Sequence, residues 1–272
     1  MNKKKNTLLW KISKPEMGHV SYLFGTIHIW NSEIEKIYHA VLPYLSQCSL
    51  FVAESDISQL GEISKDFFLL EEGQKLHDLF KPRKFEKLSA QLKRKFGITI
   101  EEVEQMSPFA LYSALGKNFL ETGNNSLDEQ LWSYAKSAGK QTTGIETAIE
   151  QMSYYGQIPM DVQADMLYEL VMKSANFRRK FNQMKTDYLD MNIVALYKSS
   201  KKGNKFIKKV LVYRRNDLMS NRIPQLVENQ SAFIALGAGH LAGRRGILKQ
   251  LKDRGFVVKP VNMSIVDNKT IA

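Results

Sequence analysis

Residues 22–30 read YLFGTIHIW, an apolar run that is typical of a buried β-strand and that leads into Gly25-x-x-His28. Residues 232–241 read AFIALGAGHL and repeat the frame, so that a second apolar run leads into a second histidine, His240. The whole chain has only five histidines. Two of them in one frame indicate that two strands of the fold end in the same way.

The segments on either side of YLFGTIHIW predict a strand, a helix and a second strand. Residues 31–45 place apolar side chains at helical spacing, and residues 49–55, SLFVAES, are typical of a short buried strand that ends near Glu54. Strands that are joined through a helix are parallel. Residues 7–12 predict a further strand, which the turn KPEMGH joins to the one at 20–25, so the predicted sheet is mixed.

The last part of the chain repeats this organisation. Residues 231–237 predict a strand, residues 242–254 a helix and residues 256–261 another strand. We therefore expect the α/β class, with a central mixed, partly parallel sheet that is flanked by helices and built on two βαβ-like Gly-x-x-His halves. Residues 60–125 have helical periodicity without candidate chemistry, which predicts a helical insertion or cap within a single domain, 1–272.

Composition and charge narrow the classes of function. No apolar run is long enough for a transmembrane segment, and the basic N-terminal stretch lacks the apolar core of a signal peptide. The sequence as given predicts a cytoplasmic protein; a removed leader and an envelope location are the alternative. The single cysteine, Cys48, excludes an internal disulfide and a Cys-based zinc site. The net charge is +11, but we interpret the densest basic run, 198–215, as a solvated helix face and loop, and we expect no nucleic-acid partner.

The motifs of several enzyme classes are absent from the sequence, among them His-Glu-x-x-His, Gly-x-Ser-x-Gly and the P-loop. The stretch GAGHLAG, residues 237–243, follows a strand and opens a helix as a dinucleotide-binding loop does. However, it lies near the end of the chain, and the next strand ends in Lys259 and Pro260 where a ribose-binding acid is expected. His240 also occupies a place that needs a small residue. We therefore do not favour a nucleotide site.

Polar side chains stand at the ends of four predicted strands. His28 follows one strand, Glu54 and Glu146 end two others, and His240 follows the last. Since the carboxyl ends of parallel strands meet at one edge of a sheet, we expect these side chains to converge. Two imidazoles and two carboxylates suit a divalent metal such as zinc, cobalt or manganese. Without a metal, His and Glu could act as general base and acid.

The glycines of the repeat have a predicted role of their own. Gly25 and Gly237 would let the chain turn sharply off each strand. Gly239 would bring backbone N–H groups close to a bound anion at a helix N-terminus.

A helix predicted at about 205–223 carries two polar residues on its inward side. Apolar residues at i, i+4 and i+7 place Arg215 and Asn216 on that side. A buried arginine needs an anionic partner, which could be Glu54, Glu146 or a substrate carboxylate. Asp128 is expected in the first turn of another helix, where the helix dipole favours an acid.

These residues carry a family resemblance. In order along the chain, YLFGTIHI, FVAES, LDEQLWSYAKSAGKQTTGIET, RRND and FIALGAGHLAGRRGILKQLKDRGFVV resemble the TraB/GumN family. The Tiki metalloproteases are related to this family, which is placed in the broader erythromycin esterase/ChaN-like fold. The likeness extends over essentially the whole chain. It implies a central sheet flanked by helices, with a site built from both Gly-x-x-His motifs.

The resemblance also implies roles for single residues. His28, His240 and Glu54 would bind or surround a divalent metal (Mn, Co or Zn), and Arg215 and Asn216 match an Arg-Asn pair that would orient substrate. Glu146 joins the catalytic candidates. We therefore expect a metal-dependent hydrolase acting on a peptide or small-molecule substrate. Two alternatives are a non-catalytic protein that binds or sequesters a peptide or cofactor, and a metal-free esterase-like hydrolase that uses His and Glu.

Overall fold

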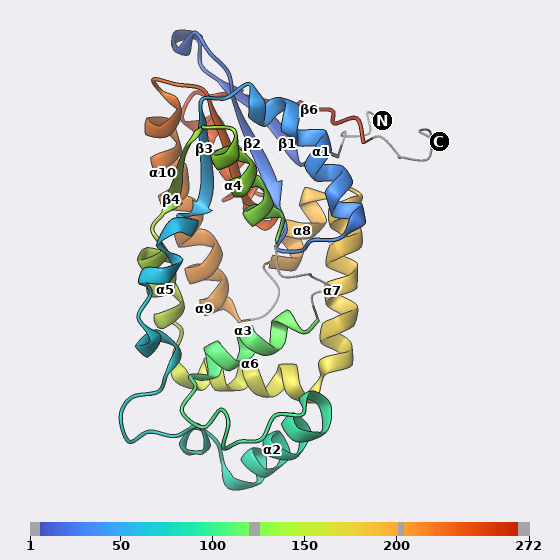
Figure 1. Ribbon diagram of the computed structural model, residues 1–272, viewed down its shortest axis with the longest axis vertical. Coiled ribbons are helices and arrows are strands. Elements are labelled where there is room, and N and C mark those ends of the chain that lie inside the picture. The colour runs from blue at the N-terminus through green and yellow to red at the C-terminus, as the bar shows by residue number, and fades with distance from the viewer. Residues whose placement is uncertain (1–5, 120–125, 201–203, 266–272) are drawn as a thin grey trace. The chain divides into compact units, whose positions relative to one another are not determined.

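The computed structural model describes residues 6–119, 126–200 and 204–265 (Figure 1). The strands are β1 (Leu9–Ser13), β2 (Ser21–Thr26), β3 (Leu50–Ser55), β4 (Gln141–Glu146), β5 (Ala232–Gly237) and β6 (Val257–Val261). The α-helices are α1 (Ser32–Ser46), α2 (Pro82–Phe96), α3 (Pro108–Lys117), α4 (Leu127–Ser137), α5 (Ala148–Gly156), α6 (Met160–Met172), α7 (Ser174–Leu189), α8 (Ile193–Ser200), α9 (Lys205–Lys208), α10 (Arg215–Val227) and α11 (Ile247–Asp253). The short 3-10 segments are η1 (Pro15–Met17), η2 (Ile57–Glu62), η3 (Lys65–Phe68), η4 (Leu76–Leu79) and η6 (Ala238–His240), and η5 (Lys209–Arg214) is π-helical.

The strands form one mixed sheet with the order β4-β3-β5-β2-β1-β6. The pairs β4–β3, β3–β5 and β5–β2 are parallel, whereas β1 is antiparallel to both of its neighbours. Both predicted halves are present as β2-α1-β3 and β5-α11-β6. The predicted α/β class, with a mixed and partly parallel sheet flanked by helices, is therefore confirmed.

Alternation along the central strands builds a core on each face of the sheet. On one face Phe51 packs against Phe233 and against Trp132 of α4, and α1 and α4 lie together on this side (Figure 1). The next residues along the strands, Val52 and Ile234, point the other way. They belong to a cluster that includes the apolar side chains of α10 and α11, among them Met219, Ile223, Val227, Leu248 and Leu251. Helices on both faces leave the strand ends as the place where polar groups gather.

The contacts divide the chain into two compact units. The first unit contains residues 1–60, 121–148 and 184–272, and with them the whole sheet. The second unit contains residues 61–120 and 149–183 and has its own apolar core, built around Leu88, Leu92, Leu111, Leu115, Leu167 and Val171. The second unit therefore groups residues 149–183 with most of the predicted insertion, whose last residues lie outside the described part of the chain. The interpretation of the chain as one domain stays a prediction.

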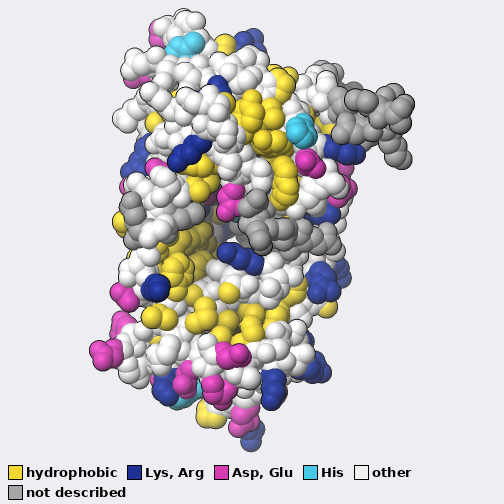
Figure 2. Space-filling model, in the orientation of Figure 1, with side chains coloured by type: hydrophobic (Ala, Val, Ile, Leu, Met, Phe, Trp, Pro, Cys, Tyr) yellow, Lys and Arg dark blue, Asp and Glu magenta, His cyan; other side chains and the backbone are white. Residues whose placement is uncertain are grey.

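The surface shows charged side chains of both signs. On the face in Figure 2, Lys and Arg side chains are interspersed with Asp and Glu. The described residues of that face therefore show no continuous basic surface of the kind that follows a nucleic-acid backbone. Part of the basic run, residues 201–203, lies outside the described residues. Within the described residues, none of the helices combines the length and the apolar character that crossing a membrane requires.

Candidate functional site

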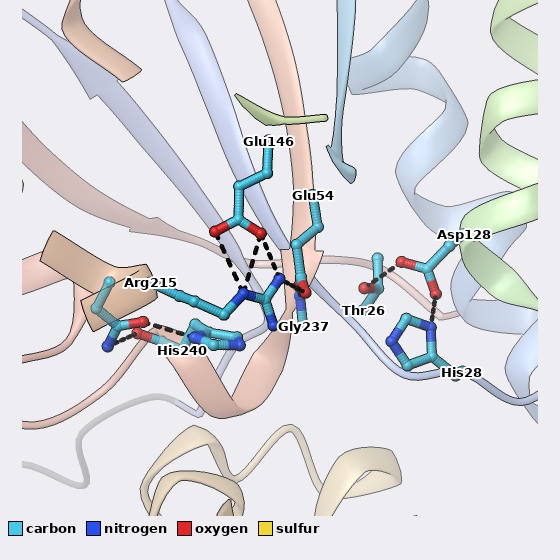
Figure 3. A network of polar contacts seen from close by, with 9 residues as sticks. Thr26, His28, Glu54, Asp128, Glu146, Arg215, Gly237 and His240 are labelled. Atoms are coloured by element: carbon cyan, nitrogen blue, oxygen red, sulfur yellow. Dashed lines mark hydrogen bonds and ion pairs between the residues drawn. The ribbon is translucent and has the colours of Figure 1, made fainter. Parts of the chain in front are cut away.

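The parallel strands bring the polar residues predicted for the site to one edge of the sheet. Thr26 ends β2, Glu54 is next to last in β3, Glu146 ends β4 and Gly237 ends β5. The register pairs Thr26 with Gly237, and Ser55 of β3 with Glu146. His28 and His240 lie in the segments that follow β2 and β5, and Figure 3 shows both rings beside this edge. The chemical roles predicted for these residues stay predictions.

Arg215, at the start of α10, is buried and holds both carboxylates of the edge. Its Nη2 donates to Glu54 Oε1 at 2.6 Å and to Glu146 Oε2 at 2.7 Å. Its Nε donates to both Glu146 oxygens, at 3.2 and 3.0 Å. The side chains of Arg215, Glu54 and Glu146 are 5%, 9% and 0% exposed. Glu54 and Glu146 are therefore anionic partners of the buried Arg215.

Glu54 is fixed from two sides. While Oε1 accepts from Arg215, its Oε2 accepts the backbone N–H of Gly237 at 2.7 Å. Burial alone would raise the pKa of Glu54, but Arg215, the two histidines and this backbone N–H act in the opposite direction and hold the pKa well below its ordinary range. Glu54 therefore stays ionised near neutral pH, and it is a poor proton donor or acceptor there.

Asn216 orients His240 and closes the loop that follows it. The amide Nδ2 donates to the carbonyl of Arg245 at 2.7 Å and to that of His240 at 3.4 Å. Because both partners of Nδ2 are acceptors, Oδ1 must face the ring, where it lies 2.5 Å from Nδ1 of His240. Nδ1 therefore carries the proton. Nε2 is left with its lone pair.

The helix that positions Arg215 and Asn216 differs from the prediction. Residues 205–223 were expected to form one regular helix, but the turn that precedes Arg215 is π-helical, in η5 (Lys209–Arg214). Such wide turns are frequent beside functional sites. The predicted burial is found all the same, since Arg215 is 4% and Asn216 0% exposed.

His28 has a polar partner that the sequence did not predict. Nδ1 of His28 lies 2.8 Å from Oδ2 of Asp128, and Oδ1 of Asp128 accepts the Thr26 hydroxyl at 2.6 Å (Figure 3). Asp128 does sit in the first turn of α4 as expected. The helix dipole explained that position by itself, so no local pattern indicated a second role.

The two imidazoles differ strongly in protonation. The Asp128 carboxylate raises the pKa of His28 to about 9. Burial lowers the pKa of His240 to about 4, and the charges of Arg215 and His28 act in the same direction. At neutral pH, in the absence of any bound group, His28 is therefore protonated and His240 is neutral.

The two strand-end glycines of the repeat differ in their position. β2 continues past Gly25 to Thr26, so the chain does not turn off the strand at Gly25, whereas Gly237 ends β5 and directly precedes η6. A Cβ on Gly25 would come within 2.7 Å of Leu241 Cδ1 and 3.0 Å of Ala238 Cβ, so the first motif packs directly on the second. A Cβ on Gly237 would come within 3.2 Å of Glu54 Oε2. Gly239 lies in a 3-10 segment of three residues, too short to act as the expected helix N-terminus.

Whether these side chains suit a metal depends on their remaining donors. In Figure 3 the second ring nitrogens, Nε2 of His28 and of His240, point toward each other, and within the described residues neither has a hydrogen-bond partner. Each Nδ1 is backed by an oxygen, as is usual for metal-binding histidines. The two rings fit as nitrogen ligands. Across the described part of the chain, no group of three or more His, Cys, Asp or Glu residues is placed to hold a metal ion, so Glu54 completes no three-ligand set.

Comparisons with known proteins give a family context. A model of the TraB/PrgY/gumN family matches residues 8–260. Metalloprotease TIKI2 of Danio rerio is 25% identical over 326 aligned residues, which cover 93% of this chain and 61% of that protein. Metalloprotease TIKI1 of Danio rerio is 22% identical over 313 residues, which cover 93% and 63%. The chain thus spans about three-fifths of the length of these relatives. No solved structure matches.

Proposed function

The chain belongs to the TraB/PrgY/gumN family, and from that premise we propose that it is a metal-dependent hydrolase of peptide bonds. One observation carries the proposal. The two Gly-x-x-His motifs lie at adjacent strand ends and turn the Nε2 atoms of His28 and His240 toward each other (Figure 3). The similarity to two proteins named as metalloproteases supports the choice of reaction.

His28 and His240 would hold the divalent ion through Nε2, and Asp128 and Asn216 would keep the rings in place through Nδ1. A divalent ion supplies a Lewis acid that polarises a peptide carbonyl and makes water a nucleophile at about neutral pH. Mn, Co and Zn all accept imidazole ligands.

The buried cluster beside the rings would contribute charge rather than protons. Glu54 and Glu146 place two carboxylates at the strand ends, where the guanidinium of Arg215 contacts both. Carboxylates favour a cation nearby. Because its guanidinium donates hydrogen bonds to both carboxylates, Arg215 would hold the carboxylates in place rather than contact substrate. The sequence-based role of orienting substrate would then fall to Asn216 and to the backbone.

The experiment is hydrolysis of a peptide library by the purified chain with Mn²⁺, Co²⁺ or Zn²⁺ added. We expect cleavage that is lost on chelation and restored by metal, and that H28A and H240A abolish. H39A is the matched control, since His39 is exposed and lies on α1 away from the strand ends. Cleavage that H28A and H240A leave unchanged would contradict the proposal, and so would peptide binding without turnover.

A second function is favoured by the opposite pKa shifts of the two rings. With a pKa of about 9, His28 could donate a proton from Nε2, and with a pKa of about 4, His240 could accept one. Such a separation is the usual sign of an acid and a base in one site. A metal-free hydrolase of this kind would keep its activity after chelation. It would still lose that activity in H28A and H240A, so chelation separates the two functions.

A further inference from the structure

The structure links Thr26, Asp128 and His28 in a chain of polar contacts that joins the end of β2 to the start of α4 (Figure 3). We propose that Asp128, held by Thr26, is a positioning residue that fixes the orientation and the tautomer of His28. This inference rests on the proposed function, because the orientation of His28 Nε2 affects activity only if that atom binds a metal or takes part in the reaction.

The positions of the protons follow from the chemistry of the groups. A carboxylate only accepts, so the Thr26 hydroxyl must donate to Oδ1 of Asp128. The other oxygen, Oδ2, forms an ion pair with His28 and lies 2.8 Å from Nδ1, and a lone pair on Nδ1 would be repelled by the carboxylate at this distance, so the proton is favoured on Nδ1. Nε2 is then the nitrogen that keeps its lone pair when the ring is neutral. Asp128 thus decides which nitrogen faces the strand ends.

The backbone holds Asp128 where this contact can form. The N–H of Leu127 donates to the carbonyl of Ile29 at 3.1 Å, which ties the first turn of α4 to the residue after His28. A capping box between Ser126 and Glu129 fixes the same turn.

Burial shows why a positioning residue is needed at this ring. Thr26 is 2% exposed and the Asp128 side chain 12%, whereas the His28 side chain is 67% exposed. An imidazole that is open to solvent has several rotamers available, and packing alone does not select among them. The buried carboxylate supplies the missing constraint.

The second histidine is positioned by a different group. His240 faces the amide oxygen of Asn216, whose Nδ2 is committed to two carbonyls. Both partners leave Nε2 as the outward nitrogen, yet only the partner of His28 is charged. The sequence repeat in Gly-x-x-His is therefore completed by two unrelated residues, one on α4 and one on α10.

The test measures the tautomer of His28 by ¹H–¹⁵N NMR of the imidazole, above the pKa of the ring, in the full chain without metal. The wild type should carry the proton on Nδ1. In D128A Nδ1 loses the carboxylate, so the ring should return to the preference of a free imidazole, whose proton lies mainly on Nε2. T26V keeps the carboxylate and should keep the Nδ1–H tautomer.

Zn²⁺ affinity is the second measurement, with E129Q as the matched control. D128A should bind Zn²⁺ about 10–100-fold more weakly than the wild type. E129Q removes a carboxylate from the same turn and should lower stability while leaving tautomer and affinity unchanged.

Two results would overturn the inference: a wild-type ring with its proton on Nε2, or a D128A variant that keeps both the wild-type tautomer and affinity. If the tautomer responds as expected but the wild type binds no metal, the positioning role stands and the proposed metal function fails.

Discussion

Replacing Arg215 with methionine should destabilise the first unit strongly. Arg215 is 4% exposed and forms ion pairs with two carboxylates that are themselves buried. In R215M both carboxylates would lose this guanidinium. Removing one partner of a buried ion pair costs about 3–5 kcal/mol, and the second carboxylate places the expected loss at the upper end of that range. Most domains are stable by only about 5–15 kcal/mol, so R215M should remain folded only marginally.

E146Q provides the internal comparison for this prediction. That substitution keeps the ion pair between Arg215 and Glu54, so its cost in stability should be that of weakened charge-assisted hydrogen bonds, about 1.5–3 kcal/mol. The double variant R215M/E146Q should be more stable than R215M alone, because only one of the two side chains that lose the guanidinium still carries a charge. This ordering follows from electrostatics and would not follow from lost packing.

The assay is urea unfolding followed by tryptophan fluorescence. All three tryptophans, Trp10, Trp30 and Trp132, lie in the first unit, so the signal reports the unit that contains the site. With a slope of about 2 kcal/mol per molar urea, R215M should lower the midpoint by about 1.5–2.5 M. K209M, an exposed change in the preceding turn, should stay within about 0.5 kcal/mol of the wild type. If R215M lowers the free energy of unfolding by less than about 1 kcal/mol, the reasoning is refuted.

Three further outcomes follow from the same geometry. His28 must lose its proton to bind a metal through Nε2, so the apparent metal affinity should rise about tenfold per pH unit up to about pH 9 and then level off. Titration calorimetry measures this profile, and an affinity that does not change with pH would exclude His28 as a ligand. The pKa of His28 in the folded chain lies above its unfolded value of 6.5, so the ion pair with Asp128 stabilises the folded state fully below pH 6.5 and loses this contribution as the pH rises to about 9. The difference in the free energy of unfolding between wild type and H28Q should therefore shrink across that window. G25A should cost about 1–3 kcal/mol of stability and reduce activity, because its Cβ would force the two motifs apart, and an unchanged unfolding midpoint would contradict that contact.

The strand ends could be predicted from sequence because their signals are local. An apolar run with a polar end marks each strand, and the parallel arrangement follows from the helix between two strands. Glu54, Glu146 and Arg215 could be grouped for the same reason, since each occupies an inward position that needs an opposite charge. Asn216 was placed on that side by helical spacing.

The contacts that the sequence did not predict are those that depend on tertiary distances. Asp128 meets Thr26 across 102 residues, and the first-turn position already had a sufficient explanation in the helix dipole. The reason for Gly25 lies in Ala238 and Leu241, which no local pattern connects to it. The π-helical turn before Arg215 likewise leaves the apolar spacing nearly unchanged, so periodicity cannot detect it.

The central claim is that His28 and His240 together hold one divalent metal ion. The most direct measurement is the metal content of the purified chain after loading with Mn²⁺, Co²⁺ or Zn²⁺ and removal of the free ion. We predict one equivalent for the wild type and for H39A, and close to none for H28A and for H240A. A wild type without bound metal, or histidine variants that retain a full equivalent, would contradict the claim.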